Sequence, residues 1–149
     1  MRPDSSREQK EAAMNEYNSI AFNYEDQGDF VTASYFYQKV IDLASSCKVR
    51  SFFIQNKQYE LIALLGLGKC HDQGKKRDQA IEILEDAFDS ASTLDAKDQR
   101  TEMVRLIGKE LIEIYIEKAE ELVKIDLSYA LKAFESGLVV SQRASERES

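Results

Sequence analysis

Apolar residues between positions 17 and 45 recur every three or four residues, in two stripes separated by Gly28. Spacings of three and four place each stripe on one face of a helix. Ala21 and Ala33 are small at positions where two helix backbones would approach closely. The segment therefore predicts two antiparallel helices joined by a tight turn. The first stripe comprises Tyr17, Ile20 and Tyr24, and the second comprises Phe30, Ala33, Tyr37, Val40 and Ile41.

The same pattern returns 47 residues later, since 68 − 21 and 80 − 33 both equal 47. Gly74 comes one place before the position equivalent to Gly28. A third copy is expected at Ala130, Phe134 and Gly137, with its register displaced by one residue. A long helix precedes it, striped by Met103, Ile107, Leu111, Tyr115, Ala119 and Leu122. The second copy has Leu64, Leu67, Gly68 and His71 in its first helix and Ala80, Leu84 and Ala87 in its second.

These patterns predict an all-α chain of six helices, because strand-like alternation is missing and the one Pro is Pro3. We expect residues 1–5 to be a disordered lead, 6–145 a single domain, and 146–149 a frayed tail. Three repeats are predicted at about 6–47, 48–93 and 95–145. Their helices should span about 6–27, 29–47, 48–73, 77–92 and 97–123, with the last beginning after a turn at 125–126. Ser5 with Glu8, Asp29 and Asp95 are the expected helix caps.

The segment 17–45 resembles a tetratricopeptide repeat (TPR) without a gap. The resemblance is carried by Tyr17, Ile20, Ala21, Tyr24, Gly28, Phe30, Ala33, Tyr37 and Val40, with Ser45 where the family usually has Pro. An ordinary helical hairpin with a similar stripe is the alternative. The resemblance implies a right-handed α-solenoid of about three TPR-like hairpins with long first helices, stabilised by stacking of each hairpin on the next.

The net charge of −7 disfavours nucleic acid and anionic membranes as partners. The longest apolar run, Leu61–Gly68, is too short to span a bilayer, and no signal peptide is evident. Cys47 and Cys70 lack a C-x-x-C spacing, which favours two reduced thiols in a cytoplasmic protein. A cytoplasmic location is therefore expected.

No residue constellation predicts catalysis, a metal site or a cofactor. His71 occupies an aromatic repeat position, which favours packing over a catalytic or metal role. The Gly66–Lys69 sequence GLGK lacks the upstream Gly, the Ser or Thr and the preceding strand of a phosphate loop. Five carboxylates on one helix are better explained by intrahelical ion pairs than by acid–base chemistry. They are Glu110, Glu113, Glu117, Glu120 and Glu121, accompanied by Lys109, Lys118 and Lys124.

The TPR resemblance implies a partner-binding groove formed by the first helix of each hairpin. The resemblance places Asn18 in this groove, where its side chain would hydrogen-bond the backbone of an extended peptide. The alternative is that these residues are ordinary exposed positions or contact a further repeat. Chaperone-binding repeats hold a terminal carboxylate with Lys, Asn and Arg side chains at fixed positions of the groove. This clamp is absent, because the equivalent positions are occupied by Asn18, Phe22, Gly66, Glu113 and Glu117. The groove residues are Asn15, Asn18, Ser19, Phe22, Glu25 and Asp26, then Ile62, Leu65, Lys69, Asp72 and Gln73.

The segments 68–88 and 111–138 are similar to axonemal proteins of the TPR family with long helices. This resemblance implies a non-catalytic scaffold or adaptor in cilia and flagella, associated with the axoneme, dynein arms or their transport. The alternative is a cytosolic peptide-binding TPR regulator or cargo adaptor. The apolar run Leu138–Val140 predicts either a further repeat or a homodimer through the C-terminal helix.

Overall fold

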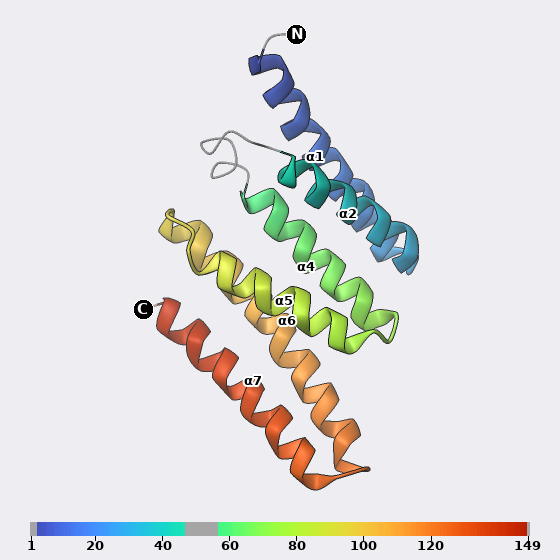
Figure 1. Cartoon of the computed structure of the whole chain (residues 1–149), viewed down its shortest axis with the longest axis vertical. Coiled ribbons are helices and arrows are strands. Elements are labelled where there is room, and N and C mark those ends of the chain that lie inside the picture. Colours follow the sequence, from blue (N-terminus) through green and yellow to red (C-terminus); the bar gives the residue numbers. More distant parts are fainter. Residues whose placement is uncertain (1–2, 47–56, 149) are drawn as a thin grey trace. The chain divides into compact units, whose positions relative to one another are not determined.

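The computed structural model describes the backbone of residues 3–46 and 57–148, and the side chains in these ranges apart from 3–7, 129, 130 and 148. These residues form six helices and no strand, which confirms the prediction of an all-α chain (Figure 1). Neighbouring helices pack against each other, consistent with a helical repeat. The helices are α1 (Pro3–Asp26), α2 (Phe30–Ser45), α4 (Lys57–Gln73), α5 (Arg77–Ala91), α6 (Lys97–Val123) and α7 (Leu127–Glu148).

The helix ends differ from the predictions at both ends of the chain. α1 begins at Pro3, inside the expected lead, because Pro has a helical φ and needs no N–H donor in the first turn. α7 continues to Glu148, so residues 146–148 are helical rather than frayed. Asp29 caps α2 as expected, accepting a hydrogen bond from the Thr32 N–H at 3.1 Å. Asp95 is not the cap of α6, since Ala96 occupies that position.

The beginning of the second predicted repeat, residues 48–56, lies outside the described residues, as does Cys47. The side chain of Ser5 in the expected capping box is likewise outside them.

The chain divides into two compact units, residues 1–76 and 77–149, which we describe one at a time. In the first unit, α2 packs against α1 and α4, and α1 also contacts α4. In the second, α6 packs against α5 and α7. The helices of the predicted second repeat, α4 and α5, belong to different units, so a single domain of three repeats stays a prediction.

Two turns have the same backbone hydrogen bonds, 47 residues apart. After α1, the N–H groups of residues 27, 28 and 29 bond the carbonyls of 23, 25 and 24; after α4, those of 74, 75 and 76 bond the carbonyls of 70, 72 and 71. Gly28 has φ +85° and Lys75 has φ +64°. The left-handed residue therefore recurs in register, although the glycine is displaced to Gly74.

α2 is the central helix of the first unit, because it packs against both α1 and α4. Ala33, Tyr37, Val40 and Ala44 of α2 are buried. The Tyr37 ring lies directly against Gly66 of α4, where a Cβ atom would be 2.2 Å from the ring carbon Cζ. Close packing therefore requires a glycine at position 66. In the second unit the requirement at Gly108 is weaker, because a Cβ there would be 3.2 Å from the Phe88 ring.

In the second unit, Ala80, Leu84, Ala87 and Ala91 of α5 repeat the buried pattern of α2. The register expected for α7 is wrong at Phe134, which is 40% exposed, whereas Gly137 is buried as expected. The side chain of Ala130 is outside the described set. α7 instead packs on α6 through an inner face of mostly small residues. This inner face comprises Ala133, Gly137, Val140 and Ala144, of which the first three are buried and Ala144 is half-buried.

Candidate functional site

The predicted groove residues lie on α1 and α4 of the first unit, but they do not form one open surface. Asn15, Ser19, Phe22 and Asp26 are exposed along one face of α1. On α4, Ile62 and Gln73 are exposed and Lys69 and Asp72 half-buried. Leu65 is buried, which corrects its expected place in the groove. Asn18 and Glu25 are engaged by neighbouring helices.

Asn18 is buried, with 8% of its surface exposed. Its side-chain Nδ2 donates a hydrogen bond to the Tyr59 carbonyl in the first turn of α4, at 3.2 Å. Its Oδ1 is also buried and has no hydrogen-bond partner. An unpaired buried acceptor costs about 1–3 kcal/mol. Asn18 therefore positions α4 against α1, and its unpaired Oδ1 is closed to solvent.

Two buried tyrosines bond glutamates across helix pairs. The Tyr37 hydroxyl donates to the Glu25 carboxylate at 2.7 Å, and the Tyr115 hydroxyl donates to Glu85. Burial, followed by the glutamate hydrogen bond, raises the pKa of both phenols above the ordinary value of 10.0. Each pair thus ties two helices of one unit together, and Glu25 is oriented toward the protein interior.

The other candidates for chemistry are accounted for by packing and ion pairs, although Glu121 and Lys118 of the acidic row pair with Arg77 and Asp78 of α5, across helices. His71 is half-buried, and burial lowers its pKa. Gly66 and Gly68 are buried inside α4 rather than in a loop after a strand. Burial raises the pKa of the Cys70 thiol to about 11. Among the described residues, no group of three or more His, Cys, Asp or Glu side chains is arranged to hold a metal ion.

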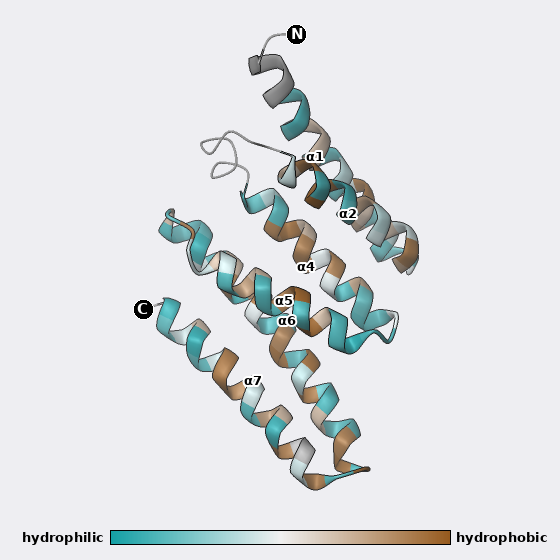
Figure 2. Ribbon diagram, in the orientation of Figure 1, coloured by the Kyte–Doolittle hydropathy of each residue, from teal (hydrophilic) through white to brown (hydrophobic). Residues whose placement is uncertain are grey.

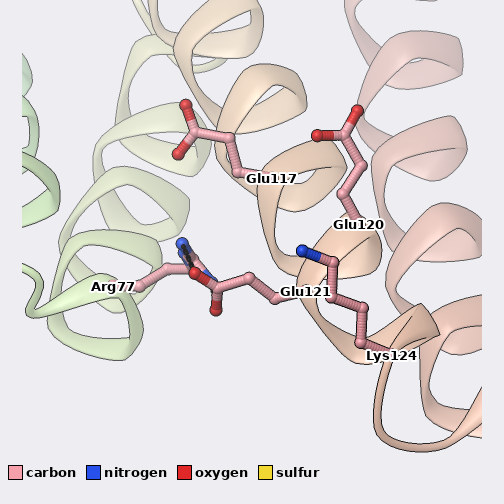
Figure 3. A pocket seen from close by; sticks show the side chains of 5 residues that line it. All are labelled: Arg77, Glu117, Glu120, Glu121 and Lys124. Carbon is pink, nitrogen blue, oxygen red and sulfur yellow. Dashed lines mark hydrogen bonds and ion pairs between the residues drawn. The ribbon is translucent and has the colours of Figure 1, made fainter.

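A polar hollow of about 470 Å³ lies between α5 and α6 of the second unit (Figure 3). Arg77 bonds both carboxylate oxygens of Glu121, at 2.6 and 3.1 Å. Figure 3 shows this pair on one side of the hollow, with the remaining charged groups around it. Because acidic and basic groups alternate and Arg77 is already paired, the hollow has no uniform charge for an ionic ligand. Its lining consists of Arg77, Glu117, Glu120, Glu121 and Lys124.

α7 carries a second apolar face, which we call the outer stripe. Its exposed fractions are 65% for Leu127, 56% for Leu131, 40% for Phe134 and 64% for Leu138. Figure 2 shows apolar residues recurring along α7. The predicted apolar run is split between the two faces, since Leu138 and Val139 are exposed and Val140 is buried. The size of the side chains separates the faces: small ones pack on α6, and large ones face outward.

A second hollow, of about 420 Å³, lies beside the outer stripe between α6 and α7. Ser141 and Ser145 line it and continue the stripe at three and seven residues beyond Leu138. Ile112 of α6 lies opposite them. Arg105, Lys109 and Glu113 of α6 also line this hollow, which follows the outer stripe along α7. Only part of the outer stripe could be found from the sequence, because Leu138 was expected to be uncovered whereas Phe134 was assigned to the interior.

No helix in the described part of the chain is both long and apolar enough to cross a membrane. No protein-family model matches the chain, and neither a curated protein nor a solved structure is detectably similar to it.

Proposed function

We propose that this chain is a non-catalytic scaffold or adaptor of TPR-like helical hairpins, which binds another protein through the outer stripe of α7. The observation that supports this function is the exposure of four large apolar side chains on a helix already packed through another face. Removing apolar surface from water is favourable by about 25 cal/mol per Å² of surface buried. Exposed apolar patches of this kind commonly mark protein-binding surfaces.

The repeat character of the proposal is supported by the turns after α1 and α4. Their three hydrogen bonds and their single left-handed residue coincide at an offset of 47 residues. This offset is the one that relates Ala33 to Ala80, both fully buried. Repeated hairpins present helix faces in series, which suits recognition of other proteins.

A pull-down comparison tests this function. Tagged wild-type chain and a Leu131→Glu/Leu138→Glu variant would be used as baits, with partners identified by mass spectrometry. The matched control is Val31→Glu, which adds a charge at an apolar residue of α2 that is 85% exposed. We expect partners of the wild type and the control to be lost from the stripe variant. The same set of partners on all three baits would refute the proposal, provided that circular dichroism shows equal helicity.

The narrower proposal of a ciliary role is supported by the resemblance of segments 68–88 and 111–138 to axonemal TPR proteins. A tagged copy expressed in ciliated cells should stay on the axoneme through detergent and salt extraction. A diffuse signal that is fully extracted would eliminate this location and leave the scaffold function itself intact.

A cytosolic peptide-binding adaptor is the second candidate, favoured by the residues exposed along one face of α1, namely Asn15, Ser19, Phe22 and Asp26. The side-chain amide of Asn15 can both donate a hydrogen bond to and accept one from the backbone of an extended peptide. A peptide array would be probed with wild-type and Asn15→Ala/Phe22→Ala chains. Peptides that bind the wild type tenfold more tightly would support this candidate, and equal binding to both chains would exclude this face of α1 as the contact.

A further inference from the structure

Three helices of this chain, α2, α5 and α7, turn small or apolar residues inward at the same spacing. In each helix the inward residues are separated by four, three and four positions. Positions of α2 and α7 correspond at an offset of 100, since 133 − 33 = 100, and those of α5 and α7 at an offset of 53, since 133 − 80 = 53. The three helices therefore have equivalent faces. The inward residues are Ala33, Tyr37, Val40 and Ala44, then Ala80, Leu84, Ala87 and Ala91, and finally Ala133, Gly137, Val140 and Ala144.

A further helix covers two of these three helices. α4 packs against α2, and α6 packs against α5. At both crossings a glycine of the covering helix lies against an aromatic ring of the helix beneath it. On α4 this glycine, Gly66, has Ala63 and Cys70 on the same face, and both are buried. Small residues of this kind let the two helices approach closely. The two ring contacts are Gly66–Tyr37 and Gly108–Phe88.

Both covering helices run antiparallel to the helix that they cover. Gly66 of α4 meets Tyr37 of α2. Cys70, which comes later on α4, interacts with Ser34, which comes earlier on α2. The same order holds on α5, because later residues of α6 contact earlier residues of α5. The contacts on α5 are Phe88–Gly108, Glu85–Tyr115 and Arg77–Glu121.

α7 is the third of these helices, and its equivalent side is exposed. Ser34, which meets α4, corresponds to Phe134 at the offset of 100. Phe88, which meets α6, corresponds to Ser141 at the offset of 53. Phe134 belongs to the outer stripe, and Ser141 lines the hollow beside it. The outer stripe and the hollow therefore lie on the side of α7 that corresponds to the covered sides of α2 and α5.

α6 adds apolar residues to this surface. Ile112 lines the hollow. Ile116 and Val123 follow it on the same face of α6, at spacings of four and seven residues, and are 40% and 52% exposed. We call the outer stripe, the hollow and these residues the α6–α7 surface. In the first unit, a helix already packs against two helices of one hairpin in this way, because α4 contacts both α1 and α2.

We propose that the α6–α7 surface binds an amphipathic helix of another protein, which runs antiparallel to α7 and turns a glycine or other small residues toward the outer stripe. This inference rests on the proposed function, because it names the class of partner for the same surface. The helix takes the place on α7 that α4 takes on α2 and that α6 takes on α5. Its apolar face is buried against the surface, and its small residues make room for Leu131, Phe134 and Leu138.

Selection from a peptide library, with the full chain as bait, tests the class of partner. The displayed peptides are amphipathic and about 20 residues long, which is long enough to be helical in water, and the central residue of their apolar face is varied. Peptides that also bind the Leu131→Glu/Leu138→Glu chain are discarded. We expect Gly, Ala or Ser to be enriched at the central position. Replacing this residue by Leu in a selected peptide should weaken binding about tenfold, because overpacking separates the helices.

Photo-cross-linking of a selected peptide to the full chain tests the direction of the helix. A benzophenone in the first turn of the peptide should cross-link to residues near Ser145, and one in the last turn to residues near Leu127. Mass spectrometry of the cross-linked fragments locates both sites. The Val31→Glu chain is the matched control, and it should bind the selected peptides as tightly as the wild type does.

The inference is wrong if no peptide depends on the outer stripe, if large residues are enriched at the central position, or if the two cross-links are exchanged. Sedimentation equilibrium of the wild-type chain alone provides a separate check. A dimer that is dissociated by Leu131→Glu/Leu138→Glu would place a second copy on this surface and would also overturn the inference. Stripe-dependent partners in the pull-down, without any selected helix, would refute this inference and support the proposed function.

Discussion

Substituting Gly66 by Ala tests the α2–α4 contact because two effects of opposite sign compete. In the interior of a helix, Ala is more favourable than Gly by about 1 kcal/mol. The new Cβ, however, would lie 2.2 Å from Cζ of Tyr37 and 2.5 Å from Cε1 and Cε2. The ring is 3% exposed and its hydroxyl is bonded to Glu25, so it has little freedom to move. Overpacking of this kind costs about 1–3 kcal/mol, so we expect a net loss of up to about 2 kcal/mol.

The sign should reverse when the ring is removed. Leu at position 37 is apolar and does not extend to the place of the Tyr37 Cζ atom, so Gly66→Ala in a Tyr37→Leu background should stabilise by up to about 1 kcal/mol. Each comparison is made within one background, because Tyr37→Leu lowers stability by itself. A double-mutant cycle would then give a coupling free energy of about 1–3 kcal/mol between the two positions.

The assay is urea unfolding followed by helical circular dichroism, with the free energy of unfolding obtained by linear extrapolation. Gly137→Ala is the control, because its Cβ would be 3.4 Å from the Cβ of Tyr115, an ordinary contact. The control should be neutral or stabilising. The reasoning fails if Gly66→Ala stabilises the wild-type background as much as it stabilises the Tyr37→Leu background.

Three further predictions concern the turns, the buried phenol and the buried thiol. Lys75→Gly should raise the free energy of unfolding by about 0.5–1 kcal/mol in urea titrations, and Gly28→Ala should lower it, because both positions have φ > 0. The raised pKa of Tyr37 means that the unfolded chain loses this proton near pH 10 while the folded chain keeps it. The contribution of Tyr37 to stability should therefore be constant below pH 10 and be lost above it, and Tyr37→Phe should lessen the fall in stability in melts between pH 9 and 11. In a Cys47→Ser background, Cys70 should react with iodoacetamide at pH 8 about a hundredfold more slowly than a peptide thiol, and urea should abolish this protection. An equally fast reaction with and without urea would contradict the burial of this thiol.

The helices of this chain could be predicted because small and apolar residues recur at fixed distances. Ala33 and Ala80 are both fully buried, 47 residues apart. The predicted bounds of residues 97–123 are those of α6. These features depend on the local spacing of apolar residues and on the small residues at one helix crossing, and both can be recognised in the sequence. The backbone hydrogen bonds of the second turn keep the offset of 47 residues, although Gly74 stands one position early.

The register of α7 could not be obtained from spacing alone, because the helix has two apolar faces with the same periodicity. Residue size is the signal that distinguishes them. Ala133 and Gly137 allow close approach to α6, whereas Leu131 and Phe134 are too large for that contact. A prediction weighted by volume as well as polarity would have selected the correct face.

The candidate site was harder still to predict, because polar residues were assumed to be exposed. Asn18 is instead buried against the carbonyl of Tyr59, and Glu25 accepts a bond from Tyr37. The first contact joins α1 to α4, which is distant in sequence, and the second joins the consecutive helices α1 and α2. No single-sequence pattern reveals which carbonyl or hydroxyl will lie opposite a given side chain after packing.

The separation of small and large side chains on α7 has a consequence for how such a protein can evolve. The residues that hold α7 on α6, such as Ala133 and Gly137, differ from those that face outward, such as Leu131 and Leu138. Changes in the outward set can alter the choice of partner without disturbing the helix packing beneath them. Descendants of one ancestral chain could in this way acquire different partners while they retain the same fold.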